Sequence, residues 1–219
     1  MNNYKNNPHV RKWLKARIPY GYYQDYLRQK EEPYDLSVID LLFISNFKGG
    51  NGAIREKTDI LKKKLLLYSK KLSDIDEKYK SKIVNNFSDS DLTNWIKDGE
   101  DFLSLAIKSD SKIDGFGPSY ASALLNSHFP DLFPIIDRRV LSGSGISIFS
   151  DSNENGVETY SSNGQVKNIE KHYGWLMRFV HQKLLDDNPT TIGCIDLELF
   201  SKDLRKEFKK QTQQSPKQP

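Results

Sequence analysis

Apolar residues recur at helical spacing along most of the chain. Within residues 60–72 the apolar positions are four, three and four residues apart, and lysines occupy the opposite side. Similar steps occur in residues 176–184 and 197–208. The pattern predicts three amphipathic helices in these segments. The apolar run at residues 36–44 is compatible with a buried helix or a buried strand, and we favour a helix.

Two segments lack this periodicity. Residues 142–168 are rich in Gly, Ser and Asn, which is typical of a long surface loop or a small hairpin. Residues 211–219 contain no apolar side chain that could be buried, which predicts a disordered C-terminal tail. We therefore expect an all-α fold in which residues 1–210 form one compact domain with an insertion at 142–168.

Composition is typical of a globular protein. Of the 219 residues, 37% are hydrophobic and 28% are charged, and 33 basic residues against 29 acidic ones leave a net charge of +4. This excess indicates a nucleic-acid partner only if the positive charge gathers on one face.

Cysteine content and apolar run length restrict the compartment. The single cysteine, Cys194, excludes an internal disulfide and a four-cysteine iron–sulfur cluster, and it favours the cytoplasm. The four histidines show no metal-ligand spacing, so no zinc site is predicted. No apolar run approaches the roughly 18 residues that a membrane-spanning helix needs, which predicts a protein without a membrane segment.

The segment 111–125 contains a candidate hairpin between two helices. A first helix is expected to end near Lys108, Gly115 and Gly117 permit unusual backbone conformations, and Pro118 suits the first turn of a second helix. Backbone amides at the start of that helix, where the helix dipole is positive, can hold a phosphate. The alternative is an ordinary helix-to-helix turn with no ligand.

Asp137 follows the hairpin at the end of an apolar segment that contains two prolines. One interpretation is a helix N-cap, a role that aspartate often fills. The other is a catalytic carboxylate, because a fixed negative charge stabilises the positive charge that develops on a sugar during glycosidic bond cleavage. The two roles are compatible.

The hairpin, 115–121, and the aspartate segment, 133–140, together resemble the corresponding block of the helix-hairpin-helix DNA glycosylase superfamily. Within it the chain most resembles compact bacterial and archaeal proteins with the 8-oxoguanine DNA glycosylase fold. The resemblance implies a two-lobed all-α fold with the hairpin block at 100–141. It also implies excision of a modified purine, 8-oxoguanine or a deazaguanine-like base, from duplex DNA. Proteins of this type are also associated with bacterial anti-phage gene clusters.

The resemblance also implies roles for individual residues. Asp137 would be catalytic, and Gly115, Gly117 and Arg139 would bind the DNA backbone. The loop at 44–54 resembles the segment that fills the gap left by a flipped base. In that loop Asn51 would be the wedge, and Lys48 would also contact DNA. The only cofactor that the resemblance allows is a monovalent cation at the hairpin.

One position departs from the family pattern. Lyase-competent relatives carry a lysine on the second hairpin helix, and Ser119, which we expect to contact DNA, stands there in this chain. A serine cannot form the Schiff base, so the resemblance implies a monofunctional glycosylase in which Asp137 assists water, unless Lys112 or another amine from a neighbouring turn takes the place of that lysine. The alternative is a non-catalytic module of the same fold that binds nucleic acid or a protein partner.

Overall fold

The computed structural model describes residues 8–50, 52–144, 168–186 and 190–202, and all regular secondary structure in these ranges is helical. The α-helices are α1 (Pro8–Gln29), α2 (Val38–Phe47), α3 (Thr58–Tyr79), α4 (Asp89–Ser104), α5 (Pro118–His128), α6 (Arg138–Gly143), α7 (Tyr173–Asp186) and α8 (Ile192–Lys202). Two short 3-10 helices are η2 (Val84–Asn86) and η3 (Ile169–His172). The all-α prediction is confirmed for the described residues. None of the helices in these ranges is long and apolar enough to cross a bilayer.

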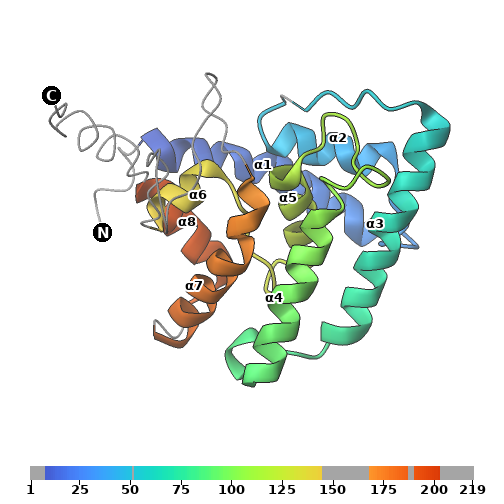
Figure 1. Ribbon diagram of the computed structural model, residues 1–219. Coiled ribbons are helices and arrows are strands. Elements are labelled where there is room, and N and C mark those ends of the chain that lie inside the picture. The colour runs from blue at the N-terminus through green and yellow to red at the C-terminus, as the bar shows by residue number, and fades with distance from the viewer. Residues whose placement is uncertain (1–7, 51, 145–167, 187–189, 203–219) are drawn as a thin grey trace, which may run out of the picture.

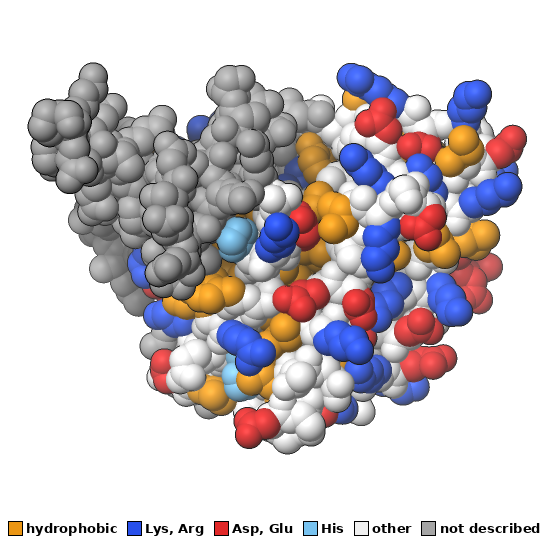
Figure 2. Space-filling model, viewed as in Figure 1, with side chains coloured by type: hydrophobic (Ala, Val, Ile, Leu, Met, Phe, Trp, Pro, Cys, Tyr) orange, Lys and Arg blue, Asp and Glu red, His pale blue; other side chains and the backbone are white. Residues whose placement is uncertain are grey.

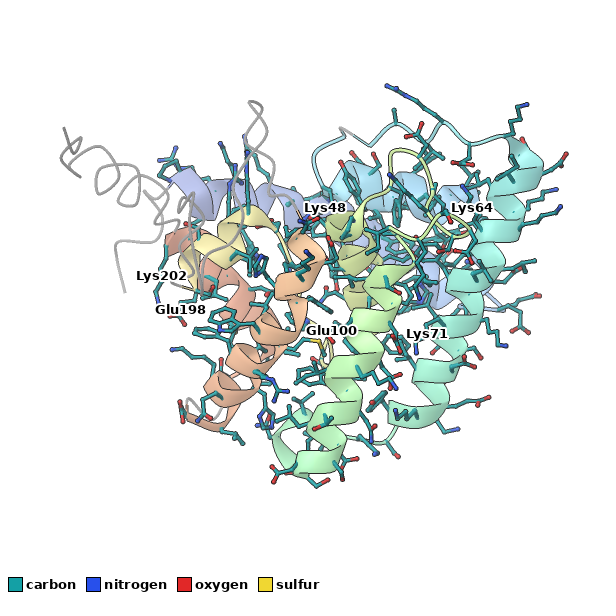
Figure 3. All side chains as sticks on the ribbon, in the orientation of Figure 1. Lys48, Lys64, Lys71, Glu100, Glu198 and Lys202 are labelled. Carbon is teal, nitrogen blue, oxygen red and sulfur yellow. The ribbon has the colours of Figure 1, made fainter. Side chains whose placement is uncertain are left out.

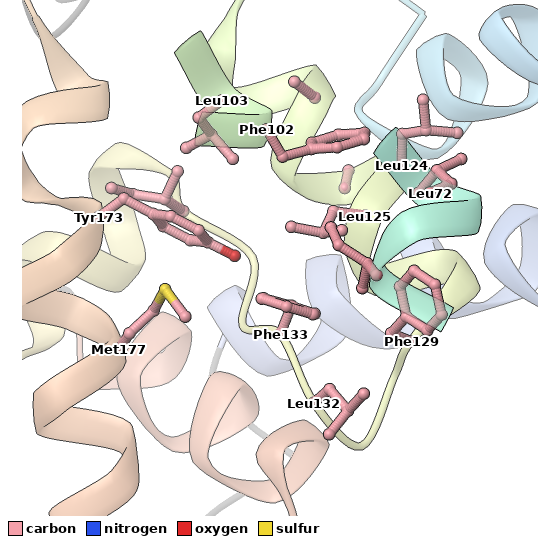
Figure 4. Close-up of a cluster of buried hydrophobic side chains, with 14 of the residues drawn as sticks. Leu72, Phe102, Leu103, Leu124, Leu125, Phe129, Leu132, Phe133, Tyr173 and Met177 are labelled. Carbon is pink, nitrogen blue, oxygen red and sulfur yellow. The ribbon is translucent and has the colours of Figure 1, made fainter. Parts of the chain in front are cut away.

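Helix α5 lies near the centre of the molecule (Figure 1). It packs against α1, α2 and α4, while α4 also packs against α3 and α7. Helices α6, α7 and α8 gather on the opposite side from α3, and α8 contacts both α6 and α1. One core connects these groups of helices, since Phe102 of α4, Leu124 of α5 and Tyr173 of α7 are all fully buried (Figure 4). Phe133, in the segment between α5 and α6, is also fully buried.

The helix predicted at residues 60–72 is confirmed as part of α3, and its four apolar positions are all buried: Leu61, Leu65, Tyr68 and Leu72. The preference for a helix at 36–44 is confirmed by α2. Helix α8 confirms the first part of the helix predicted at 197–208, but its buried positions, Ile192, Ile195, Asp196 and Leu199, form a different stripe from the predicted one. The difference arises because packing against α6 and α1 decides which side of α8 is covered. Positions 204 and 208 of the predicted stripe lie outside the described residues.

A buried aspartate fixes the turn between α1 and α2. Asp40 completes a capping box with Ser37 at the start of α2, and its Oδ1 accepts a hydrogen bond of 3.0 Å from the hydroxyl of Tyr23 on α1. Lys30 lies 3.0 Å from the same oxygen and balances its charge. Burial of this carboxylate is tolerated because each oxygen has polar partners.

Two predicted boundaries are wrong. Helix α4 ends at Ser104, not near Lys108, and a series of turns occupies residues 105–111. The insertion does not begin at residue 142, because α6 continues through Gly143. The rest of that insertion, 145–167, and the tail at 211–219 lie outside the described residues.

Candidate nucleic-acid interface and active site

Gly115 lies in the hairpin between α4 and α5 and is required by the fold of the chain itself. Its φ is +84°, which residues with a side chain rarely adopt, and a Cβ built on it would lie 1.9 Å from the carbonyl oxygen of Ala53. The neighbouring Asp114 carbonyl accepts a hydrogen bond of 3.3 Å from the amide of Arg55. The unusual backbone conformation predicted at Gly115 is present, and the backbone that comes close to it is that of the chain's own loop at 52–56.

Gly117 faces open space instead. It is the N-cap of α5 with φ −84°, and a Cβ at this position would meet no atom within 4 Å. Pro118 occupies the first turn of the helix, as predicted. Within the described part of the chain, the amides of Gly117 and Ser119 have no hydrogen-bond partner. This helix start thus combines two available donors with room for an approaching anion.

The loop after α2 is fastened to the hairpin and to α3. The amide of Asp114 donates to Oε1 of Glu56 at 3.1 Å, and Lys64 of α3 lies 3.0 Å from the same oxygen. These two contacts lower the pKa of Glu56, the hydrogen bond from Lys64 having the larger effect. The hydroxyl of Ser45 also donates to the carbonyl of Gly52 at 2.8 Å. Asn51, the predicted wedge, lies outside the described residues.

Asp137 is the N-cap of α6, so that interpretation of the sequence is confirmed. Its Oδ1 accepts hydrogen bonds from the amides of Arg139 at 2.7 Å and Val140 at 2.9 Å. Its Oδ2 lies 3.6 Å from Nζ of Lys48, directly after α2. The Asp137 side chain is 22% exposed and that of Lys48 12% exposed, so the pair sits at the surface with restricted access to water.

The segment that leads into Asp137 is held at four successive residues by side chains from three helices. Asn126 of α5 donates to the Phe133 carbonyl at 2.7 Å, and Tyr173 of α7 donates to the Pro134 carbonyl at 2.8 Å. The Ile135 amide lies 3.4 Å from Oδ2 of Asp196 on α8, and the Ile136 amide donates to Ser122 of α5 at 3.1 Å. We call residues 133–136 the anchored segment. Its anchors fix the position of the Asp137 carboxylate before any ligand binds.

Asp196 is a residue of this region that the sequence did not single out. Its side chain is buried, and burial raises its pKa to about 8, with Asp137 adding to the rise while the Ile135 amide and Lys48 oppose it. In the sequence Asp196 is one polar residue in the apolar run 195–200, and it follows Asp137 by 59 residues. Only the packing of α8 on α6 brings the two carboxyls together.

The remaining predicted residues lie around this centre. The Arg139 guanidinium is 4.8 Å from the ring centroid of Phe200 on α8, which is a cation–π contact. Ser119 is half-buried in the first turn of α5, and its carbonyl accepts a hydrogen bond of 3.0 Å from Ser122. The contacts of Arg139, Ser119 and Lys48 with DNA stay predictions, as does the monovalent cation at the hairpin.

Charge does not gather on the face shown in Figure 2. There, basic and acidic side chains alternate over α3 and α4, and several of them form ion pairs such as Lys71 with Asp98 at 2.9 Å. In Figure 3, Lys48 lies near the centre of the molecule, away from the lysines of α3 such as Lys64 and Lys71. This face therefore offers no continuous basic surface that would attract an anion. The positive groups near Asp137 are instead local: the ammonium of Lys48 and the guanidinium groups of Arg138 and Arg139, which follow Asp137 in α6.

No cluster of three or more His, Cys, Asp or Glu side chains that could hold a metal occurs in residues 8–50, 52–144, 168–186 and 190–202.

Comparison with protein-family models, with curated proteins and with solved structures gives no match to this chain. The functional argument therefore rests on the geometry of the anchored segment, Asp137 and the start of α5.

Proposed function

We propose that the protein is a DNA N-glycosylase that extrudes a modified purine from duplex DNA and hydrolyses its glycosidic bond. We further propose that its two-lobed fold is of the helix-hairpin-helix glycosylase type, with residues 1–210 as one domain. The observation that carries the proposal is the fixed and partly enclosed carboxylate of Asp137. The helix that anchors the preceding residue, α5, also begins with available amides.

Cleavage of the bond between a base and its sugar develops positive charge on the sugar ring. A carboxylate already held in place stabilises that charge without reorganising, which is the usual source of a large rate effect. Asp137 meets this requirement, because Oδ1 is held by two amides while Oδ2 faces Lys48 and the surface. Oδ2 is thus the oxygen that would face the sugar or orient the attacking water.

The start of α5 supports the second part of the proposal, binding of the DNA backbone. A phosphate at Gly117 would accept hydrogen bonds from the amides of Gly117 and Ser119 and would lie at the positive end of the helix dipole. Contacts of this kind orient a duplex without reading its sequence. The hairpin would thereby hold the strand whose base is extruded, with Asn51 filling the gap that the base leaves.

A substrate screen tests the proposal directly. The protein is incubated with duplexes that carry 8-oxoguanine, an alkylated purine, a deazaguanine or uracil, and alkali then reveals abasic sites as strand breaks. We expect breaks with at least one of the modified purines and none with uracil. Binding to these duplexes without any break would instead favour a non-catalytic nucleic-acid-binding module of the same fold.

Borohydride trapping tests whether the enzyme is monofunctional. With a duplex that contains a preformed abasic site, we expect no covalent adduct, because Ser119 replaces the hairpin lysine and Lys48 is paired with Asp137. The measurement is a mobility shift on a denaturing gel after reduction. Any adduct would contradict this expectation, and its loss in Lys48→Ala or in Lys112→Ala would identify the lysine that acts as the nucleophile.

A further inference from the structure

Asp196 is a buried acid that the proposed chemistry does not use. It is 7% exposed, and within the described residues its Oδ1 has no hydrogen-bond partner, while Oδ2 receives only the long contact of 3.4 Å from the Ile135 amide. A carboxylate with so few donors is costly to bury, whereas the neutral acid is much less so. This environment favours the protonated form.

The titratable groups that influence Asp196 come from α1, from α7 and from the ends of α2 and α6. Lys48 follows α2 and Asp137 begins α6, and both influence its ionisation. Tyr20 of α1 and Tyr173 of α7 also interact with it electrostatically, and burial raises the pKa of each tyrosine well above its ordinary value, so both stay neutral. Lys48 is the cation that lowers the pKa of Asp196, while Arg17 of α1 lies beside Tyr20, and Arg138 and Arg139 follow Asp137 in α6.

We propose that Asp196 is a positioning residue for Asp137 that works in its protonated form. The neutral acid accepts the hydrogen bond from the Ile135 amide and so supports the anchored segment. Because it carries no charge, it does not compete with Asp137 for the ammonium of Lys48. This inference rests on the proposed function, because it concerns how the Asp137 site receives DNA. If Asp196 loses its proton, a second buried negative charge competes for Lys48 and repels the phosphates of an approaching duplex. DNA binding and protonation of Asp196 thus favour one another.

The sign of the pH dependence follows from this linkage. Burial raises the pKa of Asp196 to about 8 in the folded protein, whereas the unfolded chain releases that proton near the ordinary aspartate value. The folded state therefore holds the extra proton between about pH 4 and pH 8. Its stability falls as the pH rises through this window and levels off above it. DNA affinity should fall as the pH rises through the upper end of the window.

Asp196→Asn separates this role from a merely structural one, because the amide has the shape of the neutral acid and cannot ionise. We expect the dissociation constant of a duplex with a tetrahydrofuran abasic analogue to rise about 3- to 10-fold from pH 7 to pH 9 in the wild type, within the tenfold per pH unit that one linked proton allows. In Asp196→Asn this rise should be absent. Asp74→Asn, which changes an exposed aspartate of α3, should behave as the wild type.

Thermal unfolding tests the protonation of Asp196 without any DNA. Between pH 5 and pH 8 the melting temperature of the wild type should fall more steeply than that of Asp196→Asn, and equal slopes would overturn the proposal. Equal pH dependence of DNA affinity in the two proteins would overturn the link to binding even if the melting slopes differ. Failure of the wild type to bind DNA at any pH would overturn the proposed function and this link together, while the melting slopes would still decide whether Asp196 carries the proton.

Discussion

Asp137→Asn is expected to abolish measurable base release while leaving the fold and the affinity for DNA largely unchanged. Asparagine caps helices as well as aspartate does, so the hydrogen bonds to the amides of Arg139 and Val140 are retained. What is lost is the negative charge that we propose acts on the sugar. We expect single-turnover base release to slow by roughly 10²- to 10⁴-fold, the range for a general base or a preorganised charge.

The measurement is base release under single turnover on whichever duplex the screen identifies, together with the dissociation constant for the same duplex. Asp137→Ala is the matched control, because it removes both the charge and the cap and should additionally cost about 0.5–2 kcal/mol of stability. A rate in Asp137→Asn equal to that of the wild type would mean that Asp137 serves only as the cap of α6.

Gly115→Ala is expected to destabilise the fold strongly. The new Cβ would force an unfavourable backbone conformation at φ +84° and would overlap the Ala53 carbonyl, which is backbone and cannot rotate away. Strained backbone of this kind alone costs about 1–3 kcal/mol, and the displacement of the loop at 52–56 adds to it. We expect the melting temperature to fall by about 6–12 °C, which corresponds to a total of about 3 kcal/mol in a chain of this size.

Gly117→Ala is the contrasting variant two residues away. It has an ordinary φ and open space in front, so its melting temperature should stay within about 2 °C of the wild type. Its affinity for duplex DNA should fall about tenfold, equivalent to about 1.4 kcal/mol, because the methyl group occupies the space where a phosphate would approach. Unchanged affinity in Gly117→Ala would show that the start of α5 is only a turn, and an unchanged melting temperature in Gly115→Ala would contradict the contact with Ala53.

Helices with a clear apolar stripe could be predicted from the sequence, and α3 is the best example because its buried residues recur regularly. Helix α1 did not stand out, since Pro19 lies inside it and exposed apolar residues such as Leu14 and Ile18 blur its periodicity. The buried face of α8 was misassigned for a related reason. Its segment is apolar on several sides, so only its packing against α6 and α1 decides which positions are covered.

The candidate site was predictable only where its residues are close in sequence. The hairpin glycines, Pro118 and the N-cap Asp137 each have a local signature of turn or cap. The ion pair of Asp137 with Lys48 and the proximity of Asp196 have none, because they depend on which helices meet. The sequence also could not distinguish the two glycines, although Gly115 faces the chain itself and Gly117 faces open space.

The anchored segment has a consequence for the order in which the site is completed during synthesis. Two of its four anchors, Tyr173 and Asp196, belong to helices made after it, and the contact from Ile135 to Asp196 spans 61 residues. At a translation rate of roughly 5–20 residues per second, Asp196 emerges about 3–12 s after Ile135. A nascent chain that already holds the hairpin would therefore complete the set of contacts around the anchored segment only after α8 has emerged.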